Sequence, residues 1–127
     1  MKDVSDSGGT VSGLDPNVAA ALSYVLGWIT GLIFYLVESE NRFVRFHALQ
    51  SIFFSIAVFV LFGGLSVFIS LFRVVPGVNV VMGVLGSLVS MLLSIAFFVV
   101  WIILIVRAYQ GERYKLPVVG DMAEKSA

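Results

Sequence analysis

The chain has 127 residues, of which 59% are hydrophobic and 13% are charged, and a chain this short cannot bury so much apolar surface within a water-soluble fold. An integral membrane protein is therefore the expected class. Eight basic side chains balance eight acidic ones, cysteine is absent and histidine occurs once, so nothing points to nucleic-acid binding, disulfides, thiolate chemistry or a multi-histidine metal site, and we expect no cofactor.

The N-terminal residues 1–17 are polar and rich in Ser, Gly and Asp, which is typical of a disordered tail and not of a secretory signal. Asp15 and Pro16 then predict a helix start, because Asp is a favoured N-cap and Pro suits the first helical position. Residues 18–37 carry no charge. As one helix they would span about 30 Å, the thickness of the hydrocarbon core, so they are the first predicted transmembrane helix.

Two further uncharged runs follow the charged stretch 38–47. Residues 48–72 predict a second transmembrane helix, and an alternative is that Gly63 and Gly64 break it into two short re-entrant pieces. The run 78–106 is longer than the hydrocarbon core, so we place the third span at 84–106. The expected fold is an all-α integral membrane bundle, with three transmembrane helices within residues 18–106.

Residues 107–127 carry too many charges to cross the bilayer and predict an interfacial C-terminal tail, with Gly111 as the helix C-cap. With three crossings, the sides can be compared by their Lys and Arg residues. One side holds Lys2 and Arg73, and the other holds Arg42, Arg45, Arg107, Arg113, Lys115 and Lys125. This bias predicts a multi-pass cell-membrane protein with its N-terminus outside and its C-terminus in the cytoplasm.

Small residues recur at four-residue spacing in two of the predicted helices, where they let helix backbones approach closely. They are Ala19, Ser23, Gly27 and Gly31 in the first helix and Gly86, Ser90 and Ser94 in the third. Packing among the three helices of one chain is one interpretation. A homo-oligomer or a membrane-protein partner is the other.

The densest polar stretch of the chain lies at the start of the second predicted helix and gives a candidate polar interface site. Its members are Arg42, Arg45, His47 and Gln50. One interpretation is an anchor at the lipid headgroups, and the other is a polar site that contacts a headgroup, a peptide or a partner. The anchor interpretation accounts least well for His47 and Gln50, because neither residue is a good membrane anchor. Because no ionisable residue lies within a predicted span, a pump or coupled transporter is disfavoured.

Two motifs in this chain, RFHALQ at 45–50 and YQGERYKLP at 109–117, together with LDPNVAAALSYVLGWITGLIFYLVE at 14–38, resemble a known family. It comprises small prokaryotic three-helix membrane proteins that are distantly similar to the twenty-kilodalton Tic subunit of chloroplast protein import. The family pattern falls on Arg45, Phe46, His47, Gln50, Tyr109, Gly111 and Pro117. The resemblance implies a relation to protein translocation, without an established activity for the prokaryotic members.

These observations favour a non-enzymatic membrane protein. It would act as an interaction or assembly subunit, or as a translocation-related helper. Its expected partners are the lipid bilayer and either a second copy of itself or another membrane protein. An oligomeric pore or small-solute carrier is the alternative. A lipid-acting enzyme using the His47 region is less favoured, because no catalytic motif or paired carboxylate accompanies that histidine.

Overall fold

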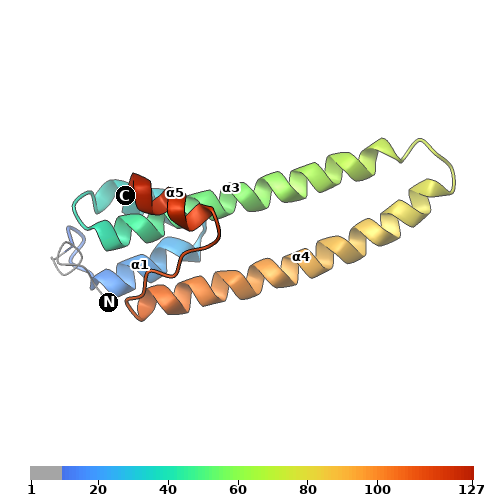
Figure 1. Ribbon diagram of the computed structural model, residues 1–127. Coiled ribbons are helices and arrows are strands. Elements are labelled where there is room, and N and C mark those ends of the chain that lie inside the picture. The colour runs from blue at the N-terminus through green and yellow to red at the C-terminus, as the bar shows by residue number, and fades with distance from the viewer. Residues whose placement is uncertain (1–9) are drawn as a thin grey trace. The chain divides into compact units, whose positions relative to one another are not determined.

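A computed structural model describes residues 10–127, and this part of the chain is helical (Figure 1). The predicted tail at 1–17 therefore lies mostly outside the described residues. The helices are α1 (Pro16–Val25), α2 (Trp28–Val37), α3 (Arg42–Leu71), α4 (Val78–Tyr109) and α5 (Val119–Ser126). The chain forms two compact units. The first contains the residues up to Ile56 together with Trp101–Ala127, and the second is Ala57–Val100.

The segment 18–37 differs from its prediction as one continuous transmembrane helix. It forms two ten-residue helices, α1 and α2, which pack against each other. The predicted start is confirmed, because Pro16 begins α1 and the Asp15 side chain accepts a hydrogen bond from the Asn17 backbone at 2.8 Å. Gly27 adopts φ 64° and ψ −128° between the helices, a conformation that side chains with a Cβ rarely adopt.

Polar side chains donate hydrogen bonds to backbone carbonyls around this break. The Thr30 hydroxyl donates to the Ser23 carbonyl at 3.1 Å, and the Ser51 hydroxyl donates to the Gly27 carbonyl at 2.8 Å. The Trp101 indole donates to the Tyr24 carbonyl at 2.5 Å. Composition alone does not reveal the break, because apolar residues continue through it and the capping groups come partly from distant helices.

Of the described helices, α3 and α4 are long and apolar enough to cross a membrane. Helix α3 begins at Arg42 instead of Ala48, because the Asn41 side chain accepts a hydrogen bond from the Val44 backbone at 3.1 Å and caps it. It continues unbroken through Gly63 and Gly64, so the alternative of two short pieces divided at these glycines is wrong. Helix α4 likewise extends beyond the predicted span 84–106 at both ends.

The second unit is an antiparallel pair formed by the ends of α3 and α4 that flank the turn at 72–77 (Figure 1). Most of its half-buried positions, taken with the buried Gly86, recur at three- or four-residue spacing, as expected for two helices packed along one seam. They are Val58, Phe62, Leu65 and Ile69 on α3, Phe72 directly after it, and Met82, Ser90, Leu93, Phe97 and Val100 on α4. Gly86 is buried in the same seam against Ile69.

Helix α4 ends in the first unit with the C-cap predicted at Gly111. Gly111 has φ 82°, its backbone donates to the Ala108 carbonyl at 3.0 Å, and the Glu112 backbone donates to the Arg107 carbonyl at 3.0 Å. This pair of bonds is a Schellman motif, which requires a left-handed residue at the position of the glycine. The motif turns the chain into an extended segment, residues 112–116, which precedes α5.

Candidate functional site

Three fully buried polar side chains meet inside the first unit. Tyr24 comes from α1, and His47 and Gln50 come from the first turns of α3. The Tyr24 hydroxyl lies 2.6 Å from Nδ1 of His47, and Nε2 of Gln50 donates to the same hydroxyl at 2.9 Å. Two residues of the predicted polar site, His47 and Gln50, are thus brought together, with a tyrosine that the sequence did not single out.

The extended segment 112–116 covers this cluster, and its backbone supplies the remaining hydrogen-bonding partners. His47 Nε2 lies 2.8 Å from the Glu112 carbonyl. Gln50 donates to the Tyr114 carbonyl at 2.8 Å and accepts from the Leu116 backbone at 2.9 Å. Residues 112, 114 and 116 alternate along the chain, so one edge of an extended segment faces α3. We refer to Tyr24, His47, Gln50 and this segment as the tail network.

The donor and acceptor roles of the partners determine where the protons lie in the tail network. The Glu112 carbonyl can only accept, so His47 carries its proton on Nε2. Nδ1 of the neutral imidazole is then an acceptor, and the Tyr24 hydroxyl donates to it. The hydroxyl oxygen in turn accepts from Gln50, whose second amide hydrogen goes to the tail. Every strong donor of the three side chains is used, which makes the network a complete structural connection between α1, α3 and the tail.

Aromatic rings enclose His47 on several sides. The ring of Phe43 lies 4.7 Å away and that of Phe46 4.9 Å away, each edge-on between centroids, and Tyr24 makes a similar contact at 5.5 Å. Burial among rings disfavours a charged imidazole. The side chain is therefore a neutral, fully bonded group, unlike a headgroup anchor at the membrane surface.

The two arginines of the predicted site lie outside the tail network. Arg42 is exposed. Arg45 stacks over the Tyr35 ring, 4.2 Å from its centroid, and donates to the Tyr35 carbonyl at 3.3 Å. The predicted site therefore separates into a buried pair that holds the tail and two arginines nearer the surface.

A second polar contact joins the two ends of the α1–α2 pair. The buried Glu38 carboxylate, one residue after α2, accepts hydrogen bonds from the Val11 backbone at 2.6 Å and the Ser12 backbone at 2.9 Å. Burial acts to raise the pKa of Glu38, but the bonds from Ser12 and Val11 outweigh it and hold the pKa below its usual value. Neither this contact nor Tyr24 was found from the sequence, because each depends on where the chain folds back.

The small-residue positions of the first segment are brought close to α3, although they do not form a stripe on one helix. Ala19 and Ser23 are buried on α1 and Gly31 is buried on α2, while Gly27 lies in the break. A Cβ on Gly31 would lie 2.9 Å from the Ala48 carbonyl. The four-residue spacing identified close-packed positions, but the helix it assumed is interrupted.

The stripe predicted on α4 holds only in part. Gly86 is buried, Ser90 is half-buried and Ser94 is exposed. A strict four-residue spacing rotates about 40° per step around a helix with 3.6 residues per turn, so Ser94 has moved off the seam.

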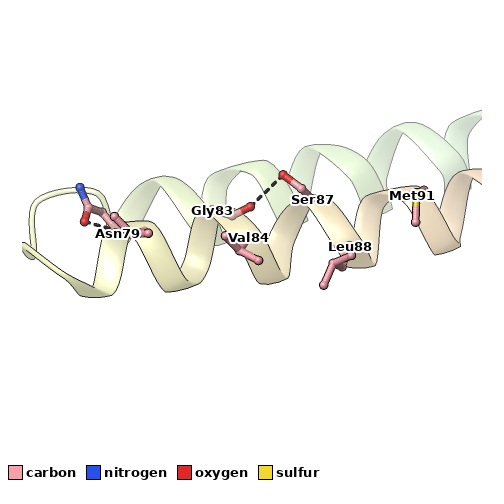
Figure 2. Close-up of a pocket in the computed structure, with 7 residues that line it drawn as sticks. Asn79, Gly83, Val84, Ser87, Leu88 and Met91 are labelled. Carbon is pink, nitrogen blue, oxygen red and sulfur yellow. Dashed lines mark hydrogen bonds between the residues drawn. The ribbon is translucent and has the colours of Figure 1, made fainter.

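The second unit carries a shallow apolar groove along α4. Figure 2 shows its lining side chains, which are Asn79, Val80, Gly83, Val84, Ser87, Leu88 and Met91. The Ser87 hydroxyl donates to the Gly83 carbonyl at 2.8 Å, so it is already bonded within its own helix. Within residues 10–127, no group of three or more His, Asp or Glu side chains is placed to hold a metal ion.

The fold and the tail network describe an all-α membrane protein whose buried polar groups serve its own architecture. Residues 10–123 match the family model described as the magnetosome magnetite crystal formation protein family (MamF/MmsF). The chain belongs to this family.

Archaeal relatives of the chain are also described as membrane proteins. A UPF0132 membrane protein of Methanocaldococcus jannaschii is 43% identical over 118 residues, which cover 93% of this chain and 94% of the relative. A second from that organism is 42% identical, over 89% of this chain and 71% of the relative. A UPF0132 membrane protein from Archaeoglobus fulgidus is 41% identical, over 86% of this chain and 92% of the relative. These relatives confirm the expected small prokaryotic membrane-protein family, and none of them is a chloroplast protein. No solved structure matches the chain.

Proposed function

We propose that the protein is a non-enzymatic assembly subunit of the cell membrane, which acts by packing its apolar helices against another membrane protein or a second copy of itself. The observation that carries this proposal is the contrast between its polar and apolar groups. The tail network is saturated by the chain's own partners, whereas the apolar side chains of the second unit extend outward.

The saturation of the tail network argues against chemistry at His47. Both ring nitrogens are engaged and the side chain is fully buried, so a general base there would first have to break its bond to Tyr24 or Glu112. A catalytic histidine needs access to the proton it transfers. We therefore assign His47 a structural role.

The apolar surface of the second unit supports packing as the mode of action. Its large side chains point away from the α3–α4 seam, and they include Phe59, Val60, Val67, Phe68 and Leu71 on α3 and Val80, Val84, Leu88 and Leu92 on α4. The groove at Gly83 and Ser87 adds a position of small side chains where another helix can approach closely. The family description names a process, magnetite crystal formation, and no reaction, which agrees with a structural role.

The more specific form, a translocation-related helper, rests on the resemblance carried by the RFHALQ and YQGERYKLP motifs. A co-purification experiment addresses both forms. The tagged chain is extracted from its native membranes in mild detergent, and a single cysteine at Ser87 is cross-linked before extraction. Because the chain has no cysteine, a cysteine at the half-buried Ser90 is a matched control within the seam.

We expect a partner at fixed stoichiometry, cross-linked through Ser87→Cys and much less through Ser90→Cys. A translocase component as the partner supports the helper form, and a second copy or another membrane protein supports assembly in general. A chain that stays monomeric and uncross-linked contradicts the proposal. Solute flux through liposomes containing only this protein would instead support the pore alternative.

A further inference from the structure

The α1–α2 pair begins and ends at the same place. The Glu38 carboxylate after α2 binds the backbone of Val11 and Ser12, which precede α1, at 2.6 and 2.9 Å. A helix that crossed a membrane would separate these two ends by the thickness of the bilayer. The segment instead goes in along α1, turns at Gly27 and returns along α2.

The length of each helix matches half of a bilayer. Ten residues at 1.5 Å per residue give about 15 Å, and the hydrocarbon core is about 30 Å thick. The uncharged stretch at 18–37 has the length of one crossing, but the structure divides it into two halves that run in opposite directions.

The turn between the helices is suited to a position inside the hydrocarbon layer. Backbone groups there need partners from the protein, because lipid offers none. Thr30 donates to the Ser23 carbonyl, and Ser51 and Trp101 donate to the Gly27 and Tyr24 carbonyls, which also accept backbone hydrogen bonds at the turn. The outer surface of the pair is apolar, with Leu22, Leu26, Trp28, Ile29, Ile33 and Leu36 exposed.

We infer that α1 and α2 form a re-entrant hairpin that inserts into one leaflet of the bilayer and contacts its acyl chains. Residues 10–15 and 38–41 then lie on one side of the membrane. The tail lies there too, since its Glu112 carbonyl binds His47 in the first turns of α3. The turn at 72–77 lies on the other side, because α3 is a continuous spanning helix.

This topology strengthens the charge asymmetry. The hairpin side holds Arg42, Arg45, Arg107, Arg113, Lys115 and Lys125 among the described residues, and the opposite side holds Arg73. The bias places the hairpin side in the cytoplasm. The N-terminal end of the described chain is thereby cytoplasmic, in place of the outside position expected from three crossings, while the cytoplasmic C-terminus is retained.

Single cysteines test this topology directly, with a membrane-impermeant thiol reagent on intact cells and on inside-out vesicles. Val11, Ser39, Val74 and Ser126 are exposed positions, and detergent-permeabilised cells show that each cysteine can react. We expect Val11→Cys, Ser39→Cys and Ser126→Cys to be protected in intact cells and labelled in inside-out vesicles, and Val74→Cys to show the reverse.

Labelling of Val11→Cys from outside, with Ser39→Cys protected, means that residues 18–37 cross the membrane, and this overturns the hairpin. Labelling of both from outside, with Val74→Cys protected, overturns the cytoplasmic placement. A Ser126→Cys chain that labels on the opposite side from Ser39→Cys separates the tail from the hairpin side and refutes the inference as well. The labelling pattern does not depend on a partner, so it tests the hairpin separately from the proposed function.

Discussion

Replacing Gln50 by leucine removes the side chain that holds the tail by both a donor and an acceptor. The variant keeps a similar volume but leaves the Tyr114 carbonyl and the Leu116 N–H without their partner. An unpaired buried polar group costs about 1–3 kcal/mol, so two of them cost about 2–6 kcal/mol if the tail stays in place. Detachment of the tail returns both groups to water, so the tail-docking free energy is the upper limit of the loss.

Hydrogen exchange at the Leu116 amide measures this loss, because that amide is protected only while the tail is docked. A loss of about 2 kcal/mol corresponds to about 30-fold faster exchange, since about 1.4 kcal/mol is a factor of ten. Gln110→Leu is the matched control, because Gln110 is exposed just after α4 and the chemical change is the same. Equal exchange at Leu116 in the two variants would refute the role assigned to Gln50.

Three further predictions concern the remaining contacts, at His47, Gly31 and Glu38. His47→Phe leaves the Glu112 carbonyl and the Tyr24 hydroxyl without their partner, so we expect a loss of about 2–6 kcal/mol in thermal unfolding in detergent and a smaller loss for His47→Gln. Gly31→Leu is expected to destabilise strongly because a Cβ already meets the Ala48 carbonyl at 2.9 Å, whereas Ile29→Leu, exposed on the same helix, is expected to melt like the wild type. Because the pKa of Glu38 is lowered on folding, its stabilisation is present above the unfolded value of about 4.3 and is lost as pH falls through the folded value. Melting temperatures from pH 7 to pH 3 are then expected to fall less steeply in Glu38→Gln, and parallel curves would contradict this assignment.

The fold class and two of the helix ends were predictable from local signals. Asp15 and Gly111 cap helices through neighbouring residues, so sequence alone located them. The break at Gly27 was not predictable in the same way, because apolar composition is identical for one long helix and two short ones. The side-chain hydrogen bonds at the break come partly from distant residues, since Ser51 and Trp101 lie on other helices.

The candidate site was likewise predictable only in part. His47 and Gln50 stood out because neither suits a membrane anchor, and the structure brings both into one buried network. Their partners are a tyrosine on α1 and backbone groups of the tail, which no side-chain pattern marks. Arg42 shared their stretch of sequence without sharing their environment, since adjacent positions on a helix face different directions.

The long sequence separation within the tail network has a consequence for biosynthesis. His47 and Gln50 find their backbone partners 64 to 66 residues later in the chain, after both long apolar helices have been made. Until residues 112–116 emerge, the first unit holds an imidazole and an amide without those partners, and closing that loop is slow compared with forming helices. The tail network can therefore be completed only after the chain has been synthesised past α4. A chain that stops earlier keeps unpaired polar groups at His47 and Gln50, and these distinguish it from the finished protein.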